Sequence, residues 1–130
     1  MRVPDALVSQ FYVAGSLRNT AGGWALEARN ALGDGTITGV GPLTIDGIEV
    51  PIAAVRLTLG SVGEVAIDAE GAIDAAAIDR FHPLRLPKGA HLTIDVRGEP
   101  LAPGEHLLGL RLIELNLGAL TMTIRDRLAG

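Results

Sequence analysis

Apolar and polar residues alternate one by one in several short segments of this chain. Alternation with a period of two places the apolar side chains on one face of a strand and the polar side chains on the other. It predicts antiparallel β-strands that each bury one face and expose the other to water. The clearest segments are residues 55–59, 64–68, 90–97 and 120–126.

Pairs of turn-forming residues separate these segments. Asp46-Gly47 lies between two apolar segments and predicts a tight β-hairpin, because both residues tolerate a positive φ. Asp34-Gly35 favours a similar turn between a strand that contains Trp24 and one over residues 36–40. The spacing predicts about eight or nine short strands. We therefore predict an all-β fold, an antiparallel two-sheet sandwich that is jelly-roll-like, formed by residues 1–130 as a single domain.

Three other segments of the chain carry further structural predictions. Residues 7–14 are expected to form the first strand. Residues 68–80 are rich in Ala and Asp and predict one or two helical turns, with Asp74 as a candidate N-cap. The last two predicted strands are 105–115 and 119–128, and the first of them carries apolar side chains on both faces. A strand with two apolar faces lies either in the middle of a packed sheet or under a partner subunit.

The composition excludes several classes of protein. The chain carries a net charge of −4 and only 3% aromatic residues, which does not favour binding to nucleic acid. No segment approaches the roughly 18 consecutive apolar residues of a membrane-spanning helix, and no signal peptide is expected at the N-terminus. Cysteine is absent, which removes disulfides and thiolate chemistry and fits a reducing compartment. We expect a soluble, cytoplasmic protein that binds neither nucleic acid nor a membrane.

No set of residues for autonomous catalysis or metal binding is recognisable in the sequence. His82, His91 and His106 lack the His-x-His spacing of a metal-binding jelly roll, and each favours a surface or turn position. The acidic residues of 68–79 do not follow the spacing of a calcium-binding loop, since Ala72 stands where an oxygen ligand is needed. No serine lies in a Gly-x-Ser-x-Gly motif. We expect no catalytic residue, metal site or cofactor in this chain.

One segment near the start concentrates turn-forming residues around an arginine. It reads Gly15-Ser16-Leu17-Arg18-Asn19-Thr20, and it forms either an ordinary loop or a functional surface. Residues 11–19, together with 43–50 and 92–106, resemble the β-subunit family of bacterial C-glycoside deglycosidases, enzymes that cleave 3-oxo-C-glycosides. The chain departs from that family at residues 31–37, which replace a Tyr-Arg-Gly and Leu-Ser element. This departure favours a different substrate or a different mode of pairing.

The resemblance implies a small (β) subunit without catalytic residues that supports a larger partner. That partner would be a (β/α)-barrel α subunit of the sugar isomerase/epimerase type, and the two would form a hetero-oligomer. The barrel would hold a divalent metal, Mn or Mg, and the acid and base that break the bond between sugar and aglycone carbons by β-elimination. The residues implied in the partner interface or the lining of the cleft are Ser16, Leu17, Arg18, Asn19, Trp24 and His106.

Two other functions stay open at this point. A stand-alone module that binds a glycoside or polysaccharide needs an exposed aromatic platform, for which Trp24 and Tyr12 are the candidates. A divergent jelly-roll enzyme would use His82, His91 or His106. Calorimetry with a panel of glycans tests the binding module, and elemental analysis for bound metal together with alanine variants of the three histidines tests the enzyme.

Overall fold

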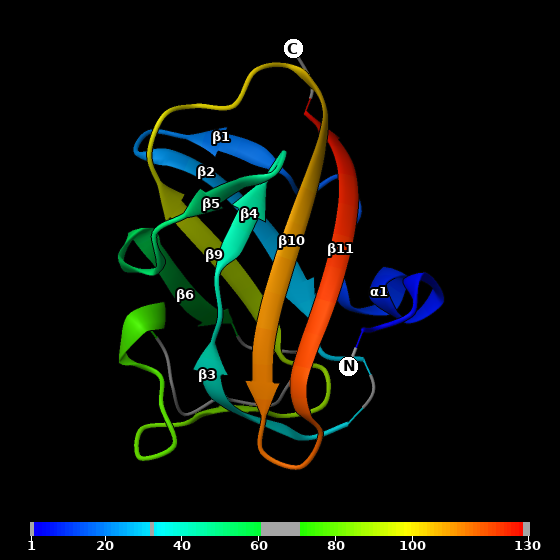
Figure 1. The fold of residues 1–130 in the computed structure, drawn as a ribbon, viewed down its shortest axis with the longest axis vertical. Coiled ribbons are helices and arrows are strands. Elements are labelled where there is room, and N and C mark those ends of the chain that lie inside the picture. Colours follow the sequence, from blue (N-terminus) through cyan, green and yellow to red (C-terminus); the bar gives the residue numbers. More distant parts are fainter. Residues whose placement is uncertain (1, 32, 61–70, 129–130) are drawn as a thin grey trace.

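The computed structural model describes residues 2–31, 33–60 and 71–128, which form a β-sandwich with a short helix at its side (Figure 1). No helix within these ranges has the length and apolar character to cross a membrane. The helical elements are α1 (Asp5–Phe11) and two 3₁₀ turns, η1 (Ile52–Ala54) and η2 (Ala75–Ala77). The strands are β1 (Arg18–Thr20), β2 (Gly23–Arg29), β3 (Gly35–Val40), β4 (Leu43–Ile45), β5 (Ile48–Val50), β6 (Val55–Gly60), β7 (Gly71–Asp74), β8 (Leu84–Leu86), β9 (His91–Arg97), β10 (Gly104–Glu114) and β11 (Gly118–Leu128).

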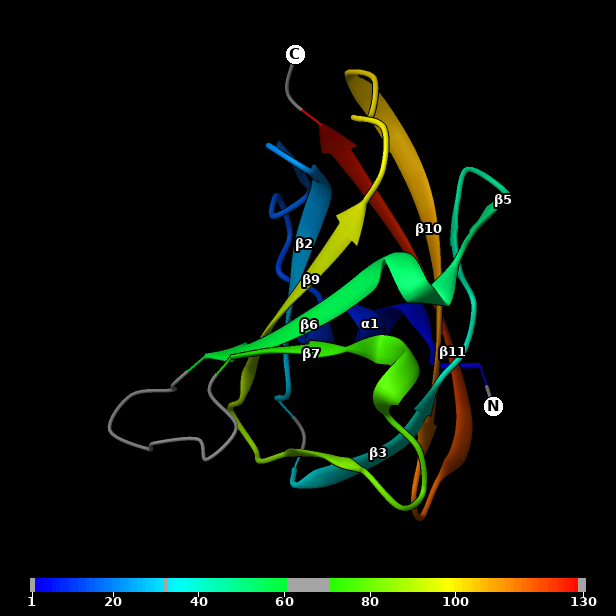
Figure 2. The same ribbon diagram turned by 90° about the vertical axis from the view of Figure 1, so that its left-hand side faces the viewer.

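These strands form two antiparallel sheets that face each other (Figure 2). The first sheet has the order β1-β2-β9-β6-β7. The second sheet has the order β5-β4-β10-β3-β8, and β11 pairs along the whole of β10. The predicted antiparallel two-sheet sandwich is therefore confirmed. The described ranges contain eleven strands, more than expected, because three-residue strands such as β1 and β8 are too short to show a period of two.

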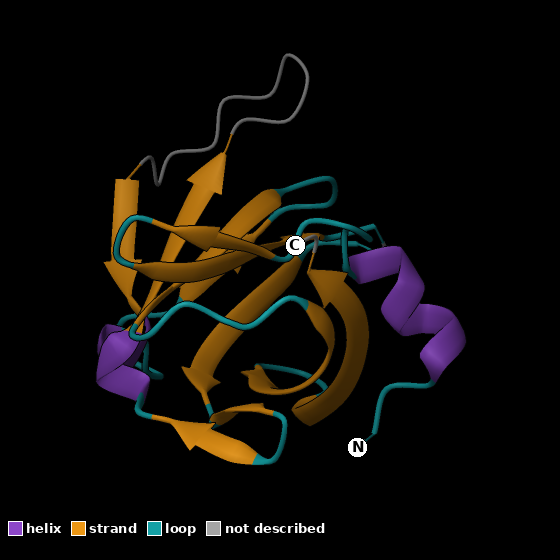
Figure 3. Cartoon of the chain, turned by 90° about the horizontal axis from the view of Figure 1, so that it is seen from above, coloured by secondary structure: helices purple, strands orange, loops and turns teal. Residues whose placement is uncertain are grey.

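Helical segments cover two opposite sides of the sandwich (Figure 3). On one side, α1 contacts β2 of the first sheet and β11 of the second. On the other side, η2 contacts β6 of the first sheet and β3 of the second. Each helical segment thus bridges the two sheets, and the space between the sheets is bordered on both flanks.

The first strand expected over residues 7–14 is wrong, because α1 occupies most of this segment. Val8 and Phe11 lie on the face of α1 that packs against the core. Pro4 precedes the helix, and its lack of a backbone N–H costs nothing there, because an N–H at this position has no partner within the helix. Asp5 adds a favourable negative charge to the first turn. The apolar spacing of three residues was the helix signal, and the chain becomes extended only after α1.

One or two helical turns were expected over residues 68–80, and the structure has strand β7 at residues 71–74 followed by a single 3₁₀ turn, η2. β7 pairs with β6, and only η2 after it is helical. Asp74 stands at the N-cap position of η2, but its side chain makes no capping hydrogen bond. Its Oδ1 lies instead 3.2 Å from Nε of Arg56 on the neighbouring strand, so an exposed ion pair replaces the expected cap. Residues 68–70 and the alternating segment 64–68 lie outside the described residues.

The two Asp-Gly pairs have different roles. Asp46-Gly47 joins β4 to β5 with φ angles of 51° and 81°, which confirms the predicted hairpin. Asp34-Gly35 does not close a hairpin, because β2 and β3 belong to different sheets. The carboxylate of Asp34 accepts a hydrogen bond from the backbone N–H of Lys88 at 2.9 Å, which stabilises this connection between the sheets. An Asp-Gly pair thus predicts a turn, whereas tertiary packing decides which strands the turn joins.

The core consists of the inward-facing side chains of both sheets, and Leu26 of β2 and Leu108 of β10 are fully buried. The alternation over residues 90–97 predicts β9 correctly, since its three inward apolar side chains are all buried. β10 has β11 on one side and both β3 and β4 on the other (Figure 1). β10 therefore lies centrally in its sheet, while the outward Leu107 and Ile113 are each exposed by 41%.

Candidate functional site

A cavity of about 330 Å³ lies between the two sheets. Its walls are inward-facing side chains of β2, β3, β6, β9, β10 and β11, together with Phe11 and Tyr12 at the end of α1. Nearly all of these side chains are aliphatic or aromatic. Pockets that hold small molecules range from about 300 to 1,000 Å³, so the cavity reaches the size at which a ligand is bound.

The cavity arises because the inward side chains of β10 and β11 do not fill the space up to the opposite sheet. Leu110, Leu112 and Leu120 face the core but are only partly buried. The chain has one Trp, one Tyr and two Phe, and of these Trp24 is packed elsewhere in the core and Phe81 is 80% exposed. Unfilled volume in a protein core costs roughly 24 cal/mol per Å³, so an apolar occupant would stabilise the fold.

Polar residues gather at one end of the cavity, where β2 and β10 end. Asn30 directly follows β2, and its side-chain amide donates to the carbonyl oxygens of Gly33 at 2.6 Å and Leu86 at 2.8 Å. These bonds tie the connection between β2 and β3 to β8. The amide therefore has a structural role at this end of the cavity.

Glu114, the last residue of β10, anchors the same end. Its carboxylate accepts backbone N–H groups from Thr36 at 3.1 Å, from Asn116 at 2.8 Å and from Leu117 at 3.1 Å. These donors, that of Thr36 above all, hold the pKa of the Glu114 carboxyl below its usual range. Glu114 thus joins β3 to the turn between β10 and β11 and fixes the shape of that turn.

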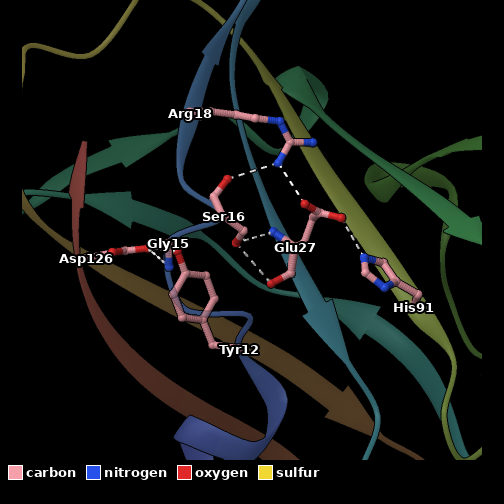
Figure 4. Close-up of polar contacts among 7 residues, drawn as sticks. All are labelled: Tyr12, Gly15, Ser16, Arg18, Glu27, His91 and Asp126. Carbon is pink, nitrogen blue, oxygen red and sulfur yellow. Dashed lines mark hydrogen bonds and ion pairs between the residues drawn. The ribbon is translucent and has the colours of Figure 1, made fainter. Parts of the chain in front are cut away.

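A polar cluster lies on the outward face of the first sheet (Figure 4). The carboxylate of Glu27 on β2 contacts Nη1 of Arg18 on β1 at 2.9 Å and Nε2 of His91 on β9 at 2.6 Å. The hydrogen bond to His91, with a smaller contribution from Arg18, holds the pKa of Glu27 below its usual range. Both carboxylate oxygens have partners. The cluster therefore links three adjacent strands rather than presenting a free base.

A second group of contacts joins the end of α1 to β11 (Figure 4). The hydroxyl of Tyr12 donates to the carboxylate of Asp126, which also accepts the backbone N–H of Gly15 at 3.0 Å. Burial, followed by the bond to Asp126, raises the pKa of Tyr12 to about 12. Burial alone would raise the pKa of Asp126, but the bond from Tyr12 and several backbone N–H groups lower it. These contacts hold Tyr12 in the wall of the cavity.

The six residues predicted for a partner interface or cleft do not form one site. Ser16 and Arg18 lie together: Ser16 Oγ accepts the backbone N–H of Glu27 at 2.9 Å, and Arg18 donates to the Ser16 carbonyl oxygen at 2.9 Å. Asn19 exchanges two hydrogen bonds with the backbone of Leu101, at 3.0 and 2.8 Å. Their role in partner binding stays a prediction.

Leu17 and Trp24 are core residues, exposed by only 4% and 3%. Tyr12 is partly buried and bound to Asp126. The two rings that were candidates for an aromatic platform therefore do not form one on the described surface. The alternative of a stand-alone carbohydrate-binding module is not supported.

His106 is buried, which differs from the surface or turn position expected for it. Its Nδ1 lies 2.6 Å from Oδ2 of Asp46, and its Nε2 lies 2.6 Å from the carbonyl oxygen of Ala102. The carbonyl of Ala102 and then the carboxylate of Asp46 raise the pKa of His106 above its usual range. His82 lies in an exposed turn beside Asp79, at 3.1 Å. Within the ranges that the structure describes, no three His, Asp or Glu side chains come close enough to hold a metal ion.

Sequence reasoning missed the cavity and the contacts around it. For the cavity, the available signal was the combination of 48% hydrophobic residues with only 3% aromatic residues. The contact between Glu27 and His91 joins residues 64 positions apart, and no spacing along the chain announces it. Glu114 was visible only as one of several carboxylates on predicted strands.

The fold and the site together define a class, an antiparallel β-sandwich domain with an apolar cavity between its sheets. The model of the family described as hydroxymethylglutaryl-CoA reductase, N-terminal domain, matches residues 7–129. The chain belongs to this family. Among curated proteins, none matches the chain significantly.

The resemblance to the β subunits of C-glycoside deglycosidases is therefore wrong, since the family match spans all three segments that carried it. Residues 43–50 are a simple hairpin, and residues 92–106 comprise most of β9, a connection and the start of β10. Such elements occur in many unrelated sandwiches. The predicted part in carbon–carbon bond cleavage and carbohydrate metabolism is corrected accordingly. The barrel partner and its Mn or Mg rested on the same resemblance.

Proposed function

We propose that this chain is a non-catalytic domain that binds the catalytic part of a hydroxymethylglutaryl-CoA reductase. The observation that carries the proposal is the family match over residues 7–129, which covers nearly all of the sandwich. Polar side chains of the described residues support it, because several that are suited to catalysis are engaged in internal bonds. Ser16 binds the backbone of Glu27, and both ring nitrogens of His106 face oxygen atoms.

The contact surface in this proposal is the turn between β10 and β11. Ile113, Leu115 and Leu117 are exposed by 41%, 63% and 62%, and we call these three side chains the turn surface. The carboxylate of Glu114 holds the backbone beneath them through its bonds to Asn116 and Leu117. Exposed apolar side chains on a preorganised turn favour a protein contact, because little conformational freedom is lost on binding.

A cytosolic location is part of the proposal. It is supported by the complete absence of cysteine from a chain of 130 residues, which fits a reducing compartment. Fractionation of cells that express the chain from its own gene checks this point. Recovery with a membrane or secreted fraction would contradict it.

The experiment that tests the proposal is co-expression with the catalytic part of the hydroxymethylglutaryl-CoA reductase encoded in the same genome. We expect the two to elute as one complex in size-exclusion chromatography with light scattering. We also expect the purified chain alone to show no reduction of hydroxymethylglutaryl-CoA. Failure of the wild-type chain to associate, or reductase activity of the chain alone, would contradict the proposal.

A pair of matched variants locates the contact. Leu115→Asp places a charge on the turn surface, and we expect it to weaken the complex by about tenfold or more. Ile48→Asp is the control, because Ile48 is similarly exposed, at 69%, but lies on β5 near the other end of β10 (Figure 1). Equal weakening by the two variants would exclude the turn surface as the specific contact.

A further inference from the structure

We propose that the cavity between the sheets binds an alkyl chain. The cavity measures about 330 Å³ and is formed by side chains of both sheets and of α1. If a heavy atom occupies roughly 30 Å³, the share of one water molecule in the liquid, the cavity accommodates about ten carbon atoms. Leu117 of the turn surface also borders this cavity, whereas Ile113 and Leu115 do not, and the inference does not depend on the function proposed above.

The chemistry of the walls selects the class of ligand. Side chains such as Leu57, Ile94 and Met122 offer no hydrogen bond to water or to a sugar. Cavities of about 150 Å³ with walls of this kind stay dry and take up small apolar molecules. Within the described residues, no buried side-chain nitrogen or oxygen lacks a hydrogen-bond partner, so the interior holds no polar group that a polar ligand would satisfy. A hydrocarbon fits these walls, and a nucleotide or sugar does not.

The position of the polar residues gives the ligand its orientation. Asn30, Asp34 and Glu114 line the cavity at the end where β2 and β10 end, whereas the deeper walls are apolar. A polar head group on the alkyl chain therefore lies at this end, and the tail extends between the sheets along the apolar walls. The tail would cover three inward-facing leucines that are only partly buried in the protein, namely Leu110, Leu112 and Leu120.

A series of unbranched primary alcohols tests the proposal by titration calorimetry on the full chain. We expect the affinity to rise by about fourfold for each added methylene, as burial of apolar surface requires. We expect this rise to level off near about ten carbons, where the cavity is full. Binding should also show a negative heat-capacity change. Absence of binding by 1-decanol, or a rise that continues past the capacity of the cavity, would overturn the proposal.

Variants separate the cavity from the surface. Ala28 lines the cavity from β2, and Ala28→Leu adds an isopropyl group to its interior. We expect this change to weaken 1-decanol binding by about tenfold or more, because the alcohol and the new side chain compete for the same volume. Ala72→Leu on the exposed face of β7 is the matched control and should bind like the wild type.

Two further variants serve as a second cavity-filling change and as a surface control. If circular dichroism shows that Ala28→Leu does not fold, Leu120→Phe fills the cavity from β11 instead. Leu115→Asp, which alters the turn surface, should leave alcohol binding unchanged. Equal binding by the wild type and a folded cavity-filling variant would overturn the proposal, and so would loss of binding in Leu115→Asp alone.

Discussion

At one end of β10 the inward-facing row of side chains begins with His106 and Leu108, and at the other end it finishes with Leu112 and Glu114. Leu108 is fully buried, whereas Leu110 and Leu112 border the cavity and are only partly buried. Each end also holds a buried ionisable side chain. The same alternation therefore produces a packed core at one end and a cavity at the other. Alternation decides which way a side chain points, and the volume of its neighbours across the sandwich decides how well it packs.

Truncation of the two leucines should show the largest difference between the ends. Leu108→Ala removes a fully packed side chain, and we expect a loss of about 3 to 5 kcal/mol in the free energy of unfolding. Leu112→Ala should cost only about 1 to 2 kcal/mol, because the space beside this side chain is already unfilled. Urea unfolding measures both values. Equal losses would contradict the packing difference between the two ends.

Removal of the Glu114 carboxylate tests how the cavity end is held. Glu114→Ala deprives three backbone N–H groups of a charged acceptor, and we expect a loss of about 2 kcal/mol in the free energy of unfolding. Glu105→Ala is the control, since this exposed glutamate forms an ion pair with Arg125 on the outward face of the same strand. Exposed pairs contribute little, so the control should unfold like the wild type.

The pH dependence of stability provides a second measurement on Glu114. Its pKa is lowered in the folded protein, so its contribution is present above the usual pKa of a glutamate and is lost as the pH falls through the lower folded value. We expect wild-type stability to decline below about pH 4.3 more steeply than that of Glu114→Gln. Parallel profiles for the two proteins would show that the carboxylate is not charged and bonded in this way.

The sequence allows the strands to be predicted better than the interior they enclose. β9, β10, β11 and the Asp46-Gly47 hairpin follow from local alternation and turn chemistry. α1 was missed because the apolar residues of a short amphipathic segment fit a strand and a helix almost equally well. The cavity is bordered by side chains of two different sheets, such as Leu57 and Leu112, which are far apart in the chain. No local sequence pattern indicates how far apart such side chains lie across the sandwich.

The candidate site shows the same limit. Ser16, Arg18 and Asn19 were singled out because they lie in one polar turn, and the structure shows that they bond to Glu27 and Leu101, which lie elsewhere in the sequence. The apolar Leu17 and Trp24 belong to the core, although the sequence placed them in the same candidate surface. A motif within one segment identifies residues with hydrogen-bonding capacity. The partners that use up this capacity come from other strands, so a polar turn alone does not identify a binding site.

The smallest expected effect concerns the packed end and the protonation of His106. Both ring nitrogens face acceptors, Oδ2 of Asp46 and the carbonyl oxygen of Ala102, so the doubly protonated ring satisfies both and its pKa is raised. A group whose pKa is raised on folding contributes fully below its unfolded pKa and loses that contribution as the pH rises through the folded value. We therefore expect wild-type stability to fall above about pH 6.5, by about 1 kcal/mol or less because Asp46 is partly exposed to solvent.

The variant His106→Gln isolates the contribution of the His106 ring. The variant retains a polar side chain but no titrating ring, so its free energy of unfolding should stay flat between about pH 6 and 8 relative to the wild type. The packing of Leu108 does not depend on this proton, and the pH effect should therefore be much smaller than that of Leu108→Ala. If the wild type and His106→Gln decline in parallel over this range, the loss of stability does not come from His106 and the packed end is insensitive to pH.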